Sequence, residues 1–148
     1  MNETALHMMR LAGKGYSCGQ ILISLALYAR GEDNPGLVRS LAGLANGCGT
    51  GLGSCGVLTG GSCVLALYAG KGADDEEASP LLQVMLEELT DWFEEKVANQ
   101  YGGPTCRDIV GDDGPEASRM KCGGIVAETF DRVMAILGEN GFDPTGGD

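Results

Sequence analysis

The sequence predicts an all-α protein, a compact multi-helix bundle around a glycine-rich central helix. Apolar residues recur at helical spacing along most of the 148-residue chain, and no segment alternates as a half-buried strand does. Hydrophobic residues make up 43% of the chain, which suffices for a core, and the length suits one domain. We therefore expect residues 1–148 to form a single helical domain that ends in a frayed tail at residues 141–148.

Capping residues mark the first predicted helix starts. Ser17 and Gln20 match a capping box, in which the two side chains satisfy backbone N–H groups of the first turn. This places Cys18 in that turn. Asn34 followed by Pro35 is typical of an N-cap and a first helical residue. The sequence thus predicts helices that begin at residues 18 and 35.

The central helix is predicted within the stretch from Ser40 to Gly70, which contains no charged residue. Apolar residues lie on several faces of this helix, as expected if neighbours bury it on all sides. They are Val57, Leu58, Val64, Leu65, Leu67 and Tyr68. Gly56, Gly60 and Gly61 lie among them, so neighbouring helices can approach the backbone closely.

Two further helices are predicted in the second half of the chain. Residues 80–101 form an amphipathic pattern, in which we assign Trp92 and Phe93 to the core and the acidic residues to the opposite face. Pro115 can start the last helix, because its missing N–H would be unpaired at that position in any case.

Four cysteines are candidates for one functional site. Cys18, Cys55 and Cys106 each follow a Ser or Thr cap, and Cys122 precedes two glycines in the last helix. The backbone N–H groups and the dipole at a helix start favour negative charge, so they lower the pKa of a thiol placed there. We therefore expect these four thiolates to converge on one site that tolerates their charge.

The other two cysteines are less readily assigned. Cys63 is followed by apolar residues and is better explained as a small buried hydrophobe, whereas Cys48 suits either role. Cys55 and Cys63 would lie about 12 Å apart along one helix, which is beyond the roughly 7 Å that a disulfide spans. Cys48 and Cys55 can meet across the glycine-rich loop. The absence of CxxC argues against zinc ribbons, ferredoxins and thioredoxin-like sites, and the absence of CxxCH argues against c-type haem.

The charge pattern excludes nucleic acid as a partner. The net charge is −11, from 21 acidic and 10 basic residues, whereas a phosphate backbone requires a basic surface. Residues 1–70 carry 3 acids and 4 bases, and residues 71–148 carry 18 acids and 6 bases. The acidic second half is interpreted either as solvated helix faces or as a docking face for a basic redox partner.

Two features predict a cytoplasmic protein without a membrane span. The N-terminal residues have no unbroken apolar stretch of the kind found in secretory signals. The uncharged stretch of residues 40–70 contains too many glycine and hydroxyl residues for a span of roughly 20 mainly apolar residues. In a reducing compartment, six cysteines indicate metal binding or redox catalysis before structural disulfides.

The cysteine pattern resembles that of a redox-active protein family named for it, C…CGAxxG…C…C. The matching residues are Cys18, then Cys55-Gly56-Val57-Leu58-Thr59-Gly60, then Cys106 and Cys122. Val57 replaces the alanine of the family pattern, and Cys48 and Cys63 are additional to it. The resemblance implies an α-helical redox domain from an anaerobic bacterium or archaeon. Split-Soret cytochromes carry a similar domain attached to a haem part. The resemblance therefore implies an iron–sulfur site in this chain, without the haem part.

Three functions follow as hypotheses. In the first, Cys18, Cys55, Cys106 and Cys122 hold a 2Fe-2S or 4Fe-4S cluster for electron transfer, with Cys48 and Cys63 as substitute ligands. In the second, the protein is a metal-free dithiol–disulfide oxidoreductase. In the third, zinc only braces the helices. We also expect a redox partner protein, and a homodimer is left open.

Overall fold

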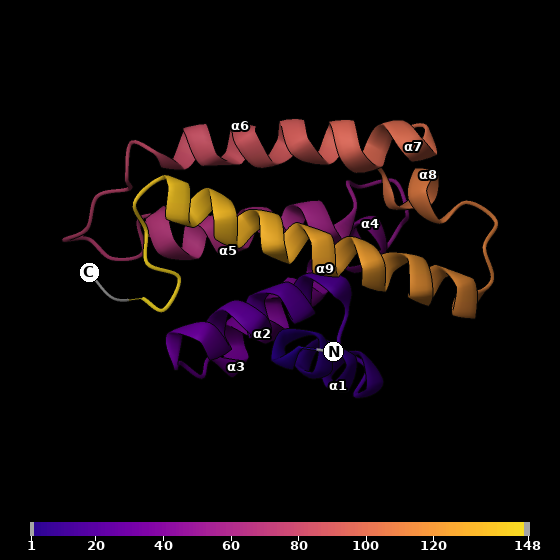
Figure 1. Cartoon of the computed structure of the whole chain (residues 1–148), viewed down its shortest axis with the longest axis horizontal. Coiled ribbons are helices and arrows are strands. Elements are labelled where there is room, and N and C mark those ends of the chain that lie inside the picture. Colours follow the sequence, from indigo (N-terminus) through magenta and orange to yellow (C-terminus); the bar gives the residue numbers. More distant parts are fainter. Residues whose placement is uncertain (1, 147–148) are drawn as a thin grey trace.

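The chain folds into helices packed around one central helix (Figure 1). The computed structural model describes residues 2–146, with residues 115–116 described by their backbone alone. No strand occurs within these residues, which confirms the all-α prediction. The helices are α1 (Glu3–Gly13), α2 (Cys18–Arg30), α3 (Pro35–Ser40), η1 (Leu41–Leu44), α4 (Ala45–Cys48), α5 (Gly56–Ala69), α6 (Leu82–Phe93), η2 (Glu94–Ala98), α7 (Asn99–Tyr101), α8 (Cys106–Val110) and α9 (Pro115–Glu139).

Helix α5 is the predicted central helix. It packs against α2, α6 and α9, which lie around it in Figure 1. Val57, Val64 and Leu65 of α5 are completely buried. Gly61 lies where a side chain would contact Leu89 of α6, at 3.2 Å from its Cβ position. The high apolar content of this short segment is therefore explained by neighbours on several of its faces.

Glycines allow α2 and α5 to cross in direct backbone contact. A Cβ atom at Gly60 would lie 2.7 Å from the Cα of Gly19, and one at Gly19 would lie 3.3 Å from the carbonyl oxygen of Gly56. Side chains at this crossing would force the helices apart. The crossing holds the N-terminal ends of the two helices, with Cys18 and Cys55, next to each other.

The predicted helix boundaries agree with the structure at most positions. Asn34 caps α3 by accepting a hydrogen bond from the Leu37 N–H at 3.1 Å. The amphipathic segment expected at residues 80–101 is helical from Leu82 to Tyr101, with one π-helical stretch at η2. Phe93 is completely buried and Trp92 is half-buried against the core, as predicted.

Several residues of the predicted frayed tail contact the bundle. Phe142 packs against the core, and the Tyr68 hydroxyl donates a hydrogen bond to the Pro144 carbonyl oxygen. The Arg30 side chain lies against Gly146. Residues 147–148 of the predicted tail lie outside the described residues. The segment is ordered because the C-terminal turn places an aromatic residue back onto the bundle, which helical periodicity alone does not reveal.

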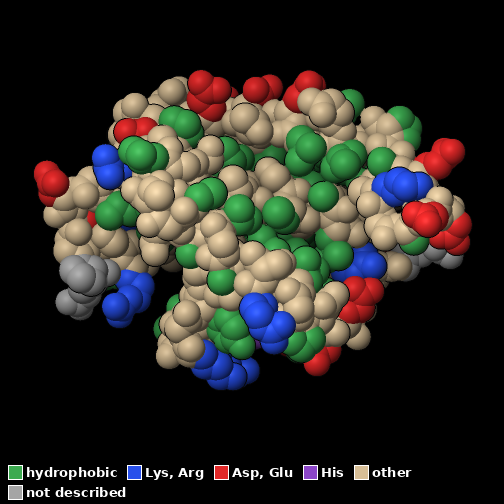
Figure 2. Space-filling model, turned by 180° about the vertical axis from the view of Figure 1, so that it is seen from behind, with side chains coloured by type: hydrophobic (Ala, Val, Ile, Leu, Met, Phe, Trp, Pro, Cys, Tyr) green, Lys and Arg blue, Asp and Glu red, His purple; other side chains and the backbone are tan. Residues whose placement is uncertain are grey.

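Acidic side chains gather on one edge of the molecule. Figure 2 shows several of them along its top edge, where α6 lies in Figure 1, and others toward the sides of the molecule. Glu87 and Asp91 of α6 and Glu94 and Glu95 of η2 are exposed, as the sequence predicts for the outer face of this segment. Within the described part of the chain, no helix combines the length and the apolar character needed to span a bilayer.

Candidate functional site

The four cysteines selected from the sequence line one cavity. Cys18, Cys55, Cys106 and Cys122 border a space of about 400 Å³ that Ile109 helps to enclose. We call these four residues the thiol site. They come from α2, the start of α5, α8 and α9, so residues more than a hundred positions apart in sequence share one cavity. Cys48 and Cys63 do not line it. All six cysteines are free thiols.

A helix cap and a glycine position Cys18. The backbone N–H of Ser17 donates to the side-chain oxygen of Gln20 at 3.0 Å, which confirms the predicted capping box. Cys18 is therefore the first helical residue of α2. Its sulfur packs over Gly56, where a Cβ atom would approach it to 2.8 Å. Gly56 thus makes the space that the Cys18 thiol occupies beside Cys55.

Backbone pairing between two loops brings Cys55 and Cys106 together. Ser54 and Thr105 form an isolated antiparallel bridge. The N–H of Cys55 donates to the Pro104 carbonyl at 2.8 Å, and the N–H of Cys106 donates to the Gly53 carbonyl at 3.1 Å. The prediction that Cys55 lies in the first turn of a helix is wrong, because Cys55 is itself the N-cap and the helix begins at Gly56. Ser54 therefore lies one residue before the cap position, where its backbone pairs with Thr105.

The glycine-rich loop before Cys55 packs tightly against α8. Asn46, Gly47 and Cys48 form a left-handed run, with φ of 55°, 61° and 58°. A Cβ atom at Gly47 would lie 2.7 Å from the Gly53 carbonyl oxygen and 2.9 Å from the Cβ of Cys106. The absence of a side chain at Gly47 therefore allows the loop and Cys106 to pack together.

Thr105 and Lys121 hold α8 and α9 at the site. Thr105 accepts a hydrogen bond from the Asp108 N–H at 3.0 Å, and Asp108 accepts one from the Thr105 N–H at 3.3 Å, which confirms the predicted cap. Lys121 donates to the Ile109 carbonyl at 2.9 Å and forms an ion pair with Asp113. These contacts tie the N-terminal part of α9 to α8, and so place Cys122 near Cys106.

Sequence reasoning missed three polar residues that line the thiol site, namely Asn46, Ser118 and Arg119. Asn46 lies in the left-handed loop, and Arg119 precedes Cys122 by one helical turn. The spacing of Arg119 and Cys122 could have indicated that they share a face of α9. Nothing in the sequence around Asn46 points to this role, because the loop conformation brings it there.

Burial raises the pKa of the cysteine thiols, contrary to the prediction from helix N-termini. The pKa of Cys18 is raised to about 11 and that of Cys55 to about 12, chiefly because burial disfavours the charged thiolate. Burial also raises the pKa of Cys106 and of Cys122. Backbone N–H groups do act in the expected direction, because the N–H of Gly19 lowers the pKa of Cys18. Desolvation outweighs this contribution.

We expect the metal-free chain to lose stability as the pH rises above about 9. In the folded chain Cys18 keeps its proton up to about pH 11, whereas the ordinary pKa of the thiol is 9.0. The folded state binds more protons across this interval, so the free energy of unfolding falls as the pH rises, by up to about 2 kcal/mol from Cys18. Urea unfolding between about pH 8 and about pH 10.5 measures the fall. The Cys18→Ala variant should show a smaller one, and an equal fall in both proteins would contradict the assignment.

No arrangement for a single metal ion is formed by the described residues. Among the side chains that the structure describes, no three or more His, Cys, Asp or Glu residues are grouped so that they could hold one ion. The four cysteines of the thiol site line a cavity. Each of the five raised cysteine pKa values has burial as its largest cause.

Comparison with known protein families gives a match over most of the chain. Residues 16–136 match a family model described as "Putative redox-active protein (C_GCAxxG_C_C)". The match contains all four residues of the thiol site. In this chain the central motif reads Cys55-Gly56-Val57, with the glycine after the cysteine. No curated protein and no solved structure matches the chain.

Proposed function

Because the chain belongs to the redox-active protein family defined by the C_GCAxxG_C_C cysteine pattern, we propose that it is an electron-transfer protein that binds one iron–sulfur cluster. The ligands would be the four cysteines of the thiol site. The observation that carries the proposal is that these four residues, from separate elements, line one cavity of about 400 Å³.

The donor set suits a cluster better than a single ion. Four thiolates are the usual ligands of 2Fe-2S and 4Fe-4S clusters. A cluster spreads its ligands over several iron atoms, so its cysteines need not surround one point. A structural zinc site needs four ligands in a tetrahedron around one ion, and the described residues form no such group. The cluster is therefore favoured over the zinc alternative.

Backbone N–H groups and one cation are available to offset the negative charge of a thiolate site. The N–H of Gly19 lowers the pKa of Cys18, and the N–H groups of Val57 and Leu58 lower that of Cys55, each by hydrogen bonding to the sulfur. Arg119 supplies a positive charge at the cavity. A bound cluster would supply one-electron chemistry. The role of the chain is to bury the site, to hold the sulfurs in place and to donate these hydrogen bonds.

One observation supports the alternative that the protein is a dithiol–disulfide oxidoreductase. The charges of Cys122 and Cys106 raise the pKa of Cys18, and the charge of Cys106 raises the pKa of Cys122, so these thiols lie close together. However, the thiolate is the form that attacks a disulfide, and raised pKa values leave little thiolate near neutral pH. Metal coordination deprotonates a thiol outright, so raised pKa values do not oppose cluster binding. The exposed acids of α6 would suit a basic redox partner in either case.

Anaerobic purification of the full chain tests the proposal. We expect a brown protein with visible absorption, and with iron and acid-labile sulfide in equal amounts. Serine variants of Cys18, Cys55, Cys106 and Cys122 should each lose most of the iron and sulfide. Cys48→Ser and Cys63→Ser serve as matched controls and should retain both. Absence of iron and sulfide from the wild-type protein would overturn the proposal.

The same samples identify the alternatives. Stoichiometric zinc without a redox transition would indicate the structural zinc module. A metal-free protein that reversibly forms an internal disulfide among the thiol-site cysteines would indicate the dithiol–disulfide oxidoreductase. Thiol alkylation followed by mass spectrometry reports that disulfide.

A further inference from the structure

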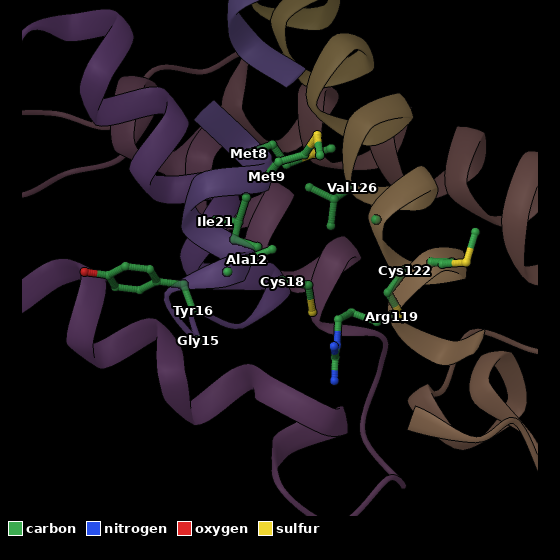
Figure 3. Close-up of a pocket in the computed structure, with 13 residues that line it drawn as sticks. Met8, Met9, Ala12, Gly15, Tyr16, Cys18, Ile21, Arg119, Cys122 and Val126 are labelled. Atoms are coloured by element: carbon green, nitrogen blue, oxygen red, sulfur yellow. The ribbon is translucent and has the colours of Figure 1, made fainter. Parts of the chain in front are cut away.

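A large apolar groove lies beside the thiol site. It has a volume of about 870 Å³ and is formed between α1, the start of α2 and the N-terminal half of α9. Cys18 and Cys122 line both this groove and the smaller cavity of the thiol site. Figure 3 shows Cys18 on α2 and Cys122 on α9 at one end of the groove, and Met8 and Met9 of α1 toward the other. The groove therefore leads from α1 to two of the four thiols.

The lining of the groove is apolar and adaptable. Met8, Ile21 and Val126 contribute aliphatic surface, while Met9 and Met120 are 55% and 78% exposed. Methionine side chains are flexible and polarisable, and they adapt to ligands of irregular shape. Large apolar side chains left in water around a concavity mark a ligand site more often than a purely structural surface. The volume lies within the range of roughly 300–1,000 Å³ found for small-molecule sites.

One charge accompanies this apolar lining. Among the described residues that line the groove, Arg119 is the only charged one, and none is acidic. The chain as a whole carries a net charge of −11. The groove is therefore a place where this acidic protein can accept an anionic group, and Arg119 lies beside Cys18 and Cys122 at its thiol end (Figure 3).

We infer that the groove binds a small amphipathic carboxylate, with its apolar body along α1 and α9 and its carboxylate at Arg119. The anionic end would then lie next to Cys18 and Cys122. The inference goes beyond the proposed function and does not depend on whether the thiol site holds a cluster. A basic partner protein would instead be drawn to the acidic edge of α6, away from the single arginine of the groove.

Binding of a fluorescent fatty acid tests the inference. The full chain is titrated with cis-parinaric acid, and with its uncharged methyl ester as a second probe. We expect one saturable site for the acid. Gly123 lines the groove, and a side chain there would meet no atom within 4 Å, so Gly123→Leu should fill the groove without disturbing the fold. This variant should weaken binding of both probes by about tenfold or more.

The neighbouring glycine provides a matched control. Gly124 is exposed, also has open space at its Cβ position and does not line the groove. Gly124→Leu should therefore bind both probes within about twofold of the wild type. Arg119→Gln should weaken binding of the acid by about threefold, as expected for a partly exposed charge pair, and leave the ester unchanged. Ala12 is exposed and lines the opposite wall of the groove, on α1. Ala12→Trp should therefore block the groove and weaken binding of both probes.

The outcomes separate this inference from the proposed function. Equal binding by Gly123→Leu and Gly124→Leu, with Ala12→Trp also unaffected, would overturn the groove as the binding site. An equal effect of Arg119→Gln on acid and ester would overturn the role of the carboxylate. Iron and sulfide are measured on the same samples. A protein without a cluster that still shows the expected pattern would overturn the proposed function and leave the groove assignment standing.

Discussion

Gly60→Ala is expected to destabilise the protein and to disrupt the thiol site. The new Cβ atom would lie 2.7 Å from the Cα of Gly19, so helices α2 and α5 would have to separate. Alanine is normally favoured over glycine inside a helix by about 1 kcal/mol, whereas overpacking against backbone costs about 1–3 kcal/mol and occasionally more. Because the atom in the way belongs to the backbone and not to a flexible side chain, the overpacking cost should exceed the propensity gain, and we expect a net loss of about 1–2 kcal/mol. Chemical unfolding of the two proteins measures it.

Gly138→Ala is the matched control for this prediction. Gly138 is also a helical glycine, but no atom lies within 4 Å of its Cβ position. Its substitution should stabilise the protein by about 0.5–1 kcal/mol through helix propensity alone. If both variants are stabilised alike, α2 and α5 do not touch through their backbones. A loss of cluster binding in Gly60→Ala but not in Gly138→Ala would further link this crossing to the thiol site.

The second large effect is expected from Gly47→Ala. Gly47 has φ of +61°, and a Cβ atom there would lie 2.7 Å from the Gly53 carbonyl oxygen and 2.9 Å from the Cβ of Cys106. The substitution therefore strains the loop and pushes it away from α8. We expect a loss of about 2–3 kcal/mol. The displaced Cys106 should also become more accessible, which its rate of alkylation in the metal-free chain measures.

Gly49→Ala separates strain from steric overlap. Gly49 also has a positive φ, of +83°, but no atom lies within 4 Å of its Cβ position. Its substitution should cost about 1 kcal/mol from the left-handed backbone alone and leave the alkylation of Cys106 unchanged. Equal losses in the two variants would mean that the loop and Cys106 are not in contact. Faster alkylation of Cys106 in Gly49→Ala would likewise argue against contact between Gly47 and Cys106.

Local chemistry in the sequence was sufficient to predict the helices. The capping residues Ser17, Asn34 and Thr105 act through hydrogen bonds to residues three positions away, so they can be recognised without the fold. The buried face of α6 follows from periodicity, and Phe93 is indeed completely buried. Ser54 was misassigned as a cap because α5 begins one residue later than the pattern indicated, with Cys55 at the cap position.

For the candidate site, the sequence predicted which cysteines take part but not their protonation behaviour. A shared pattern of capped or glycine-flanked cysteines selected Cys18, Cys55, Cys106 and Cys122, and these four line one cavity. The pKa direction was predicted wrongly. Helix N-termini lower the pKa of a thiol, but the pKa of Cys55 is raised to about 12 because the folded chain removes it from water. Desolvation depends on every surrounding atom, so local sequence does not reveal it.

The sequence by itself therefore determined the capped starts of α2, α3 and α8 and the choice of four cysteines for one site, since both depend on interactions within a few residues or on a recurring motif. Only the tertiary structure decided how those cysteines meet. Gly19 and Gly60 bring two helices into backbone contact, and the N–H of Cys106 donates to the carbonyl of Gly53, a residue far away in the sequence. It also decided that Arg119 and a groove of about 870 Å³ adjoin the thiols. Contacts between distant residues form only when the whole bundle packs. The spacing of residues along the chain therefore does not predict them.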